Sequence, residues 1–168
     1  MKAFEIRLAT IAVIFASALH GDSPILQSDT PMPAELTVAV QQELASTGAW
    51  GELQSGFVVR IHGVCRVSVR ARQGGFELPL GWVDRVDGQM LAIIHVDCSR
   101  IGQALARIAI DPGSVETRQM YARAIARVVR HELRHVLLNT ANHEKRGEDK
   151  AALTAEELVA PSFSRASR

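Results

Sequence analysis

Residues 131–143 read HELRHVLLNTANH, and the other segments of the chain are best understood from their relation to this one. Residues four apart share one face of a helix, so His131 and His135 can point at a single ion. Glu132 lies about 100° further round the helix, beside such an ion rather than on it. The spacing therefore predicts a metal site with a carboxylate that can take a proton from a metal-bound water.

A third ligand is needed, because a catalytic zinc ion takes three protein ligands and keeps one position open. His143 lies too far beyond His135 to share its helical face. If the helix stops near Asn139, the chain can turn and bring His143 back. Asn suits such a stop, because it tolerates the left-handed conformation that ends many helices. A surface helix whose histidines bind nothing is the alternative that so short a motif leaves open.

The first 21 residues read as a secretory signal peptide. A basic start precedes an apolar run at residues 8–19, which has small residues near its end. The run is short of the roughly 20 residues that span a bilayer, so we expect cleavage, after Ala18 or Gly21, with no integral membrane segment left. Cleavage removes two of the 19 basic and one of the 18 acidic residues, leaving 17 of each. A neutral mature chain gives no electrostatic reason to expect nucleic acid as a partner.

The remaining chain has the size and composition of one globular domain. The full sequence has 168 residues, of which 47% are hydrophobic and 22% are charged. Residues 22–33 contain three prolines and are predicted to be an extended lead-in. Residues 33–47 are predicted to form a helix that packs on a sheet and ends at Gly48, because apolar residues recur at fourfold spacing. These apolar residues are Leu36, Val40 and Leu44.

Runs of β-branched residues predict a mixed or antiparallel sheet of roughly three to five strands. They lie at residues 57–62, 65–70, 82–86 and 90–97. Asp87 and Gly88 form a strong hairpin signal between the last two runs. Two histidines, His62 and His95, lie within these runs. We interpret both as structural, because the helical pair supplies a better-spaced ligand set.

The chain has two cysteines, Cys65 and Cys98. In an exported protein an even count favours a disulfide. Two free buried thiols are the alternative. Zinc ligation by this pair is disfavoured because the cysteines lack the close spacing of a zinc motif.

The HExxH motif lies late in a long helix, predicted over residues 114–138 with Ser114 as its cap. Shorter helices are predicted at residues 99–107 and 151–159. One arc of the long helix is apolar and should face the core, and it consists of Ile125, Val129, Leu133 and Val136. Another arc carries arginines, which is typical of a solvated face, with a role in holding an acidic substrate as the alternative. The arginines are Arg123, Arg127, Arg130 and Arg134.

Taken together, these segments resemble a minimal zincin-type metallopeptidase and, more closely, a group of small exported bacterial HExxH proteins. The resemblance covers roughly residues 33–160. It rests on VVRIHGVC (58–65), LGWV (80–83), VDCSRI (96–101), HELRHVL (131–137), TANH (140–143) and LTAEEL (153–158). It implies an α+β domain over residues 34–160, in which a small mixed or antiparallel sheet packs on the long active-site helix and the N-terminal helix. A frayed tail would follow at residues 161–168.

The resemblance also implies a function, that of a periplasmic or secreted zinc peptidase. His131, His135 and His143 would hold Zn²⁺, and Glu132 would be the general base that activates a metal-bound water to attack a peptide carbonyl. A peptide or protein substrate would add as a strand to an exposed sheet edge, for which we expect residues 90–96. The resemblance favours pairing of the two cysteines. An exported, zinc-binding but inactive binding protein is the alternative.

The third ligand departs from the patterns of the known zincin groups. Metzincins have Gly and His where this chain has Leu138 and Ala141, and His143 comes two residues later. Gluzincins take a carboxylate from a downstream helix, and Glu156 lies within suitable range. His143 is favoured, because imidazole suits zinc and the turn that leads to it is short.

Overall fold

The computed structural model describes residues 25–161 except for 54–55, 68–78 and 110, so the expected signal peptide and nearly all of the tail lie outside it. The expected α+β fold is confirmed. In chain order the elements are β1 (Ile25–Ser28), α1 (Ala34–Ser46), α2 (Ala49–Leu53), β2 (Val58–His62), β3 (Gly81–Val86), β4 (Gln89–Asp97), α3 (Cys98–Leu105), α4 (Val115–Leu137), the 3₁₀ turn η1 (Gly147–Asp149) and α5 (Ala155–Val159).

The four strands form one mixed sheet in the order β1-β2-β4-β3. β1, β2 and β4 are parallel, and β3 is antiparallel to β4. The expected extended lead-in thus contains a strand that pairs with β2. Asp87 and Gly88, both at positive φ, make the tight hairpin between β3 and β4, as predicted. The prediction that residues 90–96 form an edge was wrong, because β4 pairs on both sides and its hairpin partner β3 is outermost.

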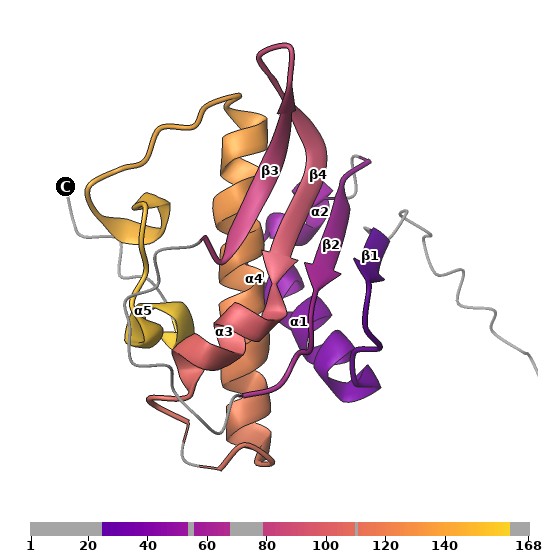
Figure 1. Ribbon diagram of the computed structural model, residues 1–168, viewed down its shortest axis with the longest axis vertical. Helices are drawn as coiled ribbons and strands as arrows, with labels where there is room; N and C mark the ends of the chain where they lie inside the picture. Colours follow the sequence, from indigo (N-terminus) through magenta and orange to yellow (C-terminus); the bar gives the residue numbers. More distant parts are fainter. Residues whose placement is uncertain (1–24, 54–55, 68–78, 110, 162–168) are drawn as a thin grey trace, which may run out of the picture.

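One face of the sheet carries the core. The side chains of Val59, Ile61, Ile94 and Val96 are at most 1% exposed, and Figure 1 shows α1, α2 and α4 behind the strands on one side of the sheet. The three predicted contact residues of α1 are buried against α4 and its surroundings. Gly48, at φ 78°, follows the end of α1 as expected. Since side chains alternate along a strand, the intervening residues project from the other face.

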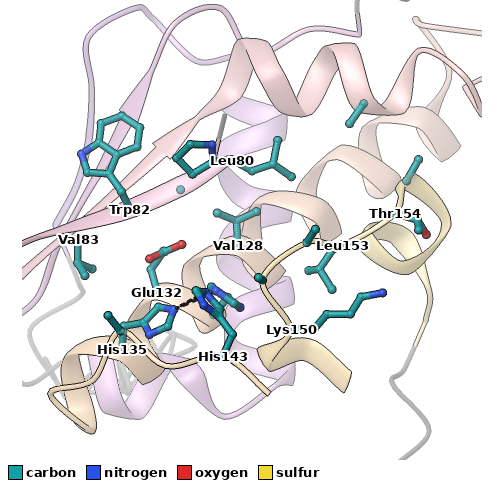
Figure 2. Close-up of a pocket in the computed structure, with 18 of the residues that line it drawn as sticks. Leu80, Trp82, Val83, Val128, Glu132, His135, His143, Lys150, Leu153 and Thr154 are labelled. Atoms are coloured by element: carbon teal, nitrogen blue, oxygen red, sulfur yellow. Dashed lines mark hydrogen bonds between the residues drawn. The ribbon is translucent and has the colours of Figure 1, made fainter. Parts of the chain in front are cut away.

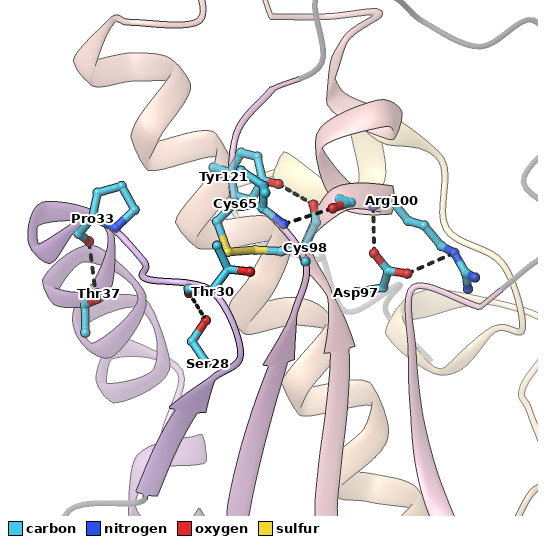
Figure 3. Close-up of a disulfide and its surroundings, with 12 residues drawn as sticks. Ser28, Thr30, Pro33, Thr37, Cys65, Asp97, Cys98, Arg100 and Tyr121 are labelled. Carbon is cyan, nitrogen blue, oxygen red and sulfur yellow. Dashed lines mark hydrogen bonds and ion pairs between the residues drawn. A yellow bond between two sulfur atoms is a disulfide. The ribbon is translucent and has the colours of Figure 1, made fainter.

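A disulfide joins Cys65, beyond the end of β2, to Cys98 at the start of α3, with the two Cα atoms 4.8 Å apart (Figure 3). The strand expected from residue 65 is absent over residues 65–67, and the rest of that prediction lies outside the described residues. These residues instead pack against α3, where the carbonyl of Arg66 lies so close to Gly102 that a side chain at position 102 would collide with it. The buried Tyr121 hydroxyl donates a hydrogen bond to the Cys98 carbonyl.

The disulfide is typical of proteins that fold in an oxidising, exported compartment. Within the described residues, no helix combines the length and the apolar character needed to cross a membrane.

Replacing both cysteines with Ser should lower the free energy of unfolding by about 3–4 kcal/mol, as the chain-entropy relation gives for a loop of this size. The two cysteines are 33 residues apart in the sequence. Denaturant unfolding of the oxidised wild type, the reduced wild type and the double variant measures the loss. The reduced wild type is the matched control, since it should be destabilised to a similar degree. A double variant as stable as the oxidised protein would contradict the prediction.

The arginines of α4 do not line a solvated face, which corrects that interpretation. Arg127 is only 5% exposed and donates to the backbone carbonyls of Glu157 and Ala160. Arg123 donates to the carbonyl of Val159 at 2.8 Å. The C-terminal segment therefore packs across α4, and guanidinium groups satisfy its carbonyl oxygens. Removal of such donors would leave buried acceptors unpaired, which is costly.

Candidate metal centre

Helix α4 presents the motif from its last two turns. Its N-terminus is capped as predicted, with the Ser114 hydroxyl accepting from the Thr117 N–H at 3.1 Å. Its predicted apolar arc is buried at Ile125, Val129 and Leu133 and partly buried at Val136. With this arc packed against the sheet, the neighbouring arc that carries the motif is turned toward β3 and the C-terminal segment.

The helix ends in a Schellman turn. Asn139 adopts φ 45°, the Asn139 N–H donates to the Val136 carbonyl at 3.1 Å, and the Thr140 N–H donates to the His135 carbonyl at 3.0 Å. The predicted stop at Asn139 is therefore confirmed. The turn is also tied to the sheet, because the Asn139 side-chain oxygen accepts from the Met90 N–H at 2.9 Å.

Three imidazoles converge beside this turn (Figure 2). The Nε2 atom of His135 lies 3.1 Å from Nε2 of His131 and 3.2 Å from Nε2 of His143. Tetrahedral zinc with Zn–N bonds of about 2.0–2.1 Å would hold two ligand nitrogens about 3.3 Å apart, so both separations suit such an ion. Among the described residues this is the group whose ligand atoms could hold a metal ion. Glu156 lines the same cavity but does not join the group.

A contact on the far side of the His135 ring orients it. Nδ1 of His135 lies 2.7 Å from the Thr140 carbonyl, which requires an N–H at Nδ1 and leaves Nε2 as an electron-pair donor. The turn that redirects the chain thus also sets the tautomer of His135. Burial and the neighbouring charge of His135 lower the pKa of His143 despite the opposing effect of Asp149. A neutral imidazole is the form that binds a metal.

The loop that carries His143 is held by ion pairs. The guanidinium of Arg134 lies 2.8 Å from the Asp149 carboxylate and 3.5 Å from that of Glu144. The Glu144 N–H also donates to the Asp149 carbonyl at 2.8 Å. The charge of Arg134 is therefore compensated within the loop, which disfavours the alternative of a substrate-holding role.

Glu132 stands beside the three imidazoles and is 7% exposed. Burial raises its pKa to about 7. The close approach of β3 causes this burial: a Cβ at Gly81 would lie 3.0 Å from Cγ of Glu132 and 2.5 Å from a methyl group of Val128. Only a glycine lets the strand pass at this distance. This role of Gly81 was not predicted from the sequence, although a glycine at the start of a strand signals such an approach.

The cluster opens into a cavity of about 580 Å³. Its walls come from β3, from α4 and from residues 150–156, and most of the side chains are apolar. The apolar side chains include Leu80, Trp82, Val83, Met90, Val128 and Leu153. Lys150, at the rim, is paired with Glu157 at 2.5 Å. The arrangement can therefore hold a cation, a proton acceptor and an extended apolar ligand side by side.

His62 and His95 lie outside this cluster and bond to each other instead.

No family model, curated protein or solved structure matches the chain.

Proposed function

We propose that this chain is a zinc-dependent peptidase of the minimal zincin type. The convergence of the His131, His135 and His143 nitrogens next to a buried carboxylate, at the mouth of an apolar cavity, is the observation that carries the proposal. An all-imidazole set of three favours zinc among common metals and leaves a coordination position for chemistry.

When bound, zinc supplies Lewis acidity and activates water. Glu132 accepts the proton of the attacking water and then delivers it to the leaving amine. In the metal-free protein, burial raises the pKa of Glu132 to about 7. The charge of a bound cation would lower this pKa and favour the ionised form, which is the form that accepts a proton. The Thr140 carbonyl keeps His135 in the tautomer that leaves Nε2 available.

The substrate side of the proposal rests on β3. Within the described part of the chain this strand pairs only with β4, so its outer edge carries backbone groups that an extended peptide can bond. The cavity alongside is lined mainly by apolar side chains. A peptide that carries a large apolar residue beside the scissile bond is therefore the substrate class that fits.

The proposal places the mature protein in the periplasm or outside the cell. The apolar run at residues 8–19 is typical of a secretory signal, and the disulfide between Cys65 and Cys98 agrees with export.

The proposal is tested by elemental analysis of the mature protein and by its activity on a peptide library. We expect one zinc per chain, cleavage beside large apolar residues, loss of cleavage on chelation and recovery on adding zinc. Stoichiometric zinc without any cleavage would instead favour the binding-protein alternative. Absence of any stoichiometric metal would leave a metal-free scaffold.

A further inference from the structure

A chain of four hydrogen-bonded side chains crosses the open face of the sheet. Asp29 Oδ2, just beyond β1, lies 3.2 Å from Nδ1 of His62 in β2. Nε2 of His62 lies 2.9 Å from Nδ1 of His95 in β4, and Nε2 of His95 lies 3.1 Å from Oδ2 of Asp84 in β3. The chain thus links the segments of all four strands. It lies on the face opposite α1, α2 and α4, because the residues flanking His95 are buried in the core.

The two imidazoles meet end to end. Their planes differ by 11°. Their centroids are 5.1 Å apart, and their nearest nitrogens are 2.9 Å apart, so these two nitrogens lie between the ring centres. The indole of Trp82 lies nearly parallel to both rings, at 6° to His95 and 16° to His62. At the metal centre, by contrast, the ring of His135 stands at 78° to its neighbours. End-to-end rings at this spacing suit one hydrogen between the nitrogens, not two metal bonds of about 2.0 Å.

The number of hydrogens follows from the contacts. An ionised carboxylate only accepts hydrogen bonds, so the outer nitrogen of each ring must carry a hydrogen. The contact between the rings needs one more. The four ring nitrogens therefore carry three hydrogens in total. Two neutral histidines would carry only two, one on each ring. We propose that His62 and His95 share one extra proton, and that with Asp29 and Asp84 they form a clasp, the proton clasp, that positions strand β3.

The carboxylates at both ends suit this charge. Desolvation works to raise the pKa of Asp29, but bonds from the Gly63 N–H, His62 and Thr30 lower it overall, which favours the ionised form. Both carboxylates are about half exposed, whereas the His95 side chain is 8% exposed. The clasp therefore holds its most buried ring between a partner imidazole and an anion, and this arrangement stabilises a shared positive charge.

The clasp reaches the candidate metal centre through β3. Asp84 lies where the pairing of β3 with β4 shifts register between Val83 and Arg85, and such irregularities often redirect a side chain near an active site. Upstream in the same strand, Gly81 covers Glu132 and Trp82 lines the cavity. Asp84 and His95 are thus positioning residues for the cavity wall. This inference concerns the sheet and holds whether or not the chain is a peptidase.

The first test counts the hydrogens. In the purified protein labelled with ¹⁵N-histidine at pH 7, we expect three protonated nitrogens over the His62 and His95 rings. Asp84→Asn should reduce the number to two, because an amide can donate to His95 and a neutral pair then satisfies every contact. Asp87→Asn in the adjacent turn removes the same charge without touching the rings and should leave three. Two protonated nitrogens in the wild type would overturn the proposal.

The second test measures the position of β3 through amide hydrogen exchange. Asp84→Ala removes a charge-assisted bond, so we expect exchange of the β3 amides to accelerate by about tenfold to a hundredfold, while the α1 amides are unchanged. Asp84→Asn, which keeps a bond to His95, should lie between this variant and the wild type. Far-UV circular dichroism of all three proteins confirms that they are folded. Unchanged β3 exchange in Asp84→Ala would show that the clasp does not position the strand.

Discussion

Peptide cleavage should fall by about 10²–10⁴ when Glu132 is replaced by Gln, while zinc stays bound. Gln has nearly the same shape as Glu but cannot accept a proton, and the three imidazoles that hold the metal are untouched. Glu116→Gln is the matched control, because Glu116 is an exposed residue in the first turn of the same helix. Single-turnover cleavage and zinc content of the two variants decide the matter. Wild-type cleavage by Glu132→Gln would remove the general-base role.

Glu132→Gln should be more stable than the wild type when both proteins lack metal. Burial raises the pKa of Glu132 from 4.5 to about 7, so the folded protein favours the protonated form. The contribution of the protonated Glu132 to the free energy of unfolding is fully present below about pH 4.5 and is lost as the pH rises through 7. The loss amounts to about 3 kcal/mol by pH 8. Gln carries no charge, so denaturant unfolding should show the variant gaining at pH 8 and little difference at pH 4.

Zinc affinity should fall by more than about 100-fold in His143→Ala, since loss of an outer partner of a ligand alone costs 10–100-fold. Two imidazoles would remain where a zinc site needs three protein ligands. Glu156→Gln is the matched control and should keep its zinc, because Glu156 lies outside the converging group. Elemental analysis after dialysis and competition with a chelator measure both variants. The reverse result, with zinc lost only from Glu156→Gln, would make Glu156 the third ligand.

His143→Ala should leave the metal-free fold intact. The side chain of His143 is exposed and belongs to a loop that is held by the ion pair of Arg134 with Asp149. Thermal unfolding of the metal-free variant should therefore match that of the metal-free wild type, while addition of zinc should stabilise the wild type alone. A destabilised metal-free variant would point to a structural role of His143 instead.

Much of the local structure was predictable because it depends on neighbours in the chain. The Ser114 cap and the stop at Asn139 each involve residues a few positions apart, and each is present. The buried arc of α4 follows from its helical period. For the same reason the pairing of His131 with His135 and the return of His143 could be anticipated from the motif.

The features that failed or were missed depend on partners far away in the sequence. An arginine such as Arg127 is typical of a solvated position. Its side chain is nevertheless buried, and a carbonyl that it bonds belongs to a segment 30 residues later. The central place of β4 depends on its pairing with β2, which no local pattern indicates. The hydrogen bond of His62 to His95 spans 33 residues and arises only once the two strands are in register.

The sequence by itself thus determined the α+β class, the ends of α4 and the three histidines, because helix period, caps and turns are short-range. Only the tertiary structure decided which strand borders the cavity, how deeply Glu132 is buried and how the four-residue clasp forms. These depend on strand order and on the approach of Gly81 to α4, where packing between distant segments selects one arrangement among many that the local pattern allows.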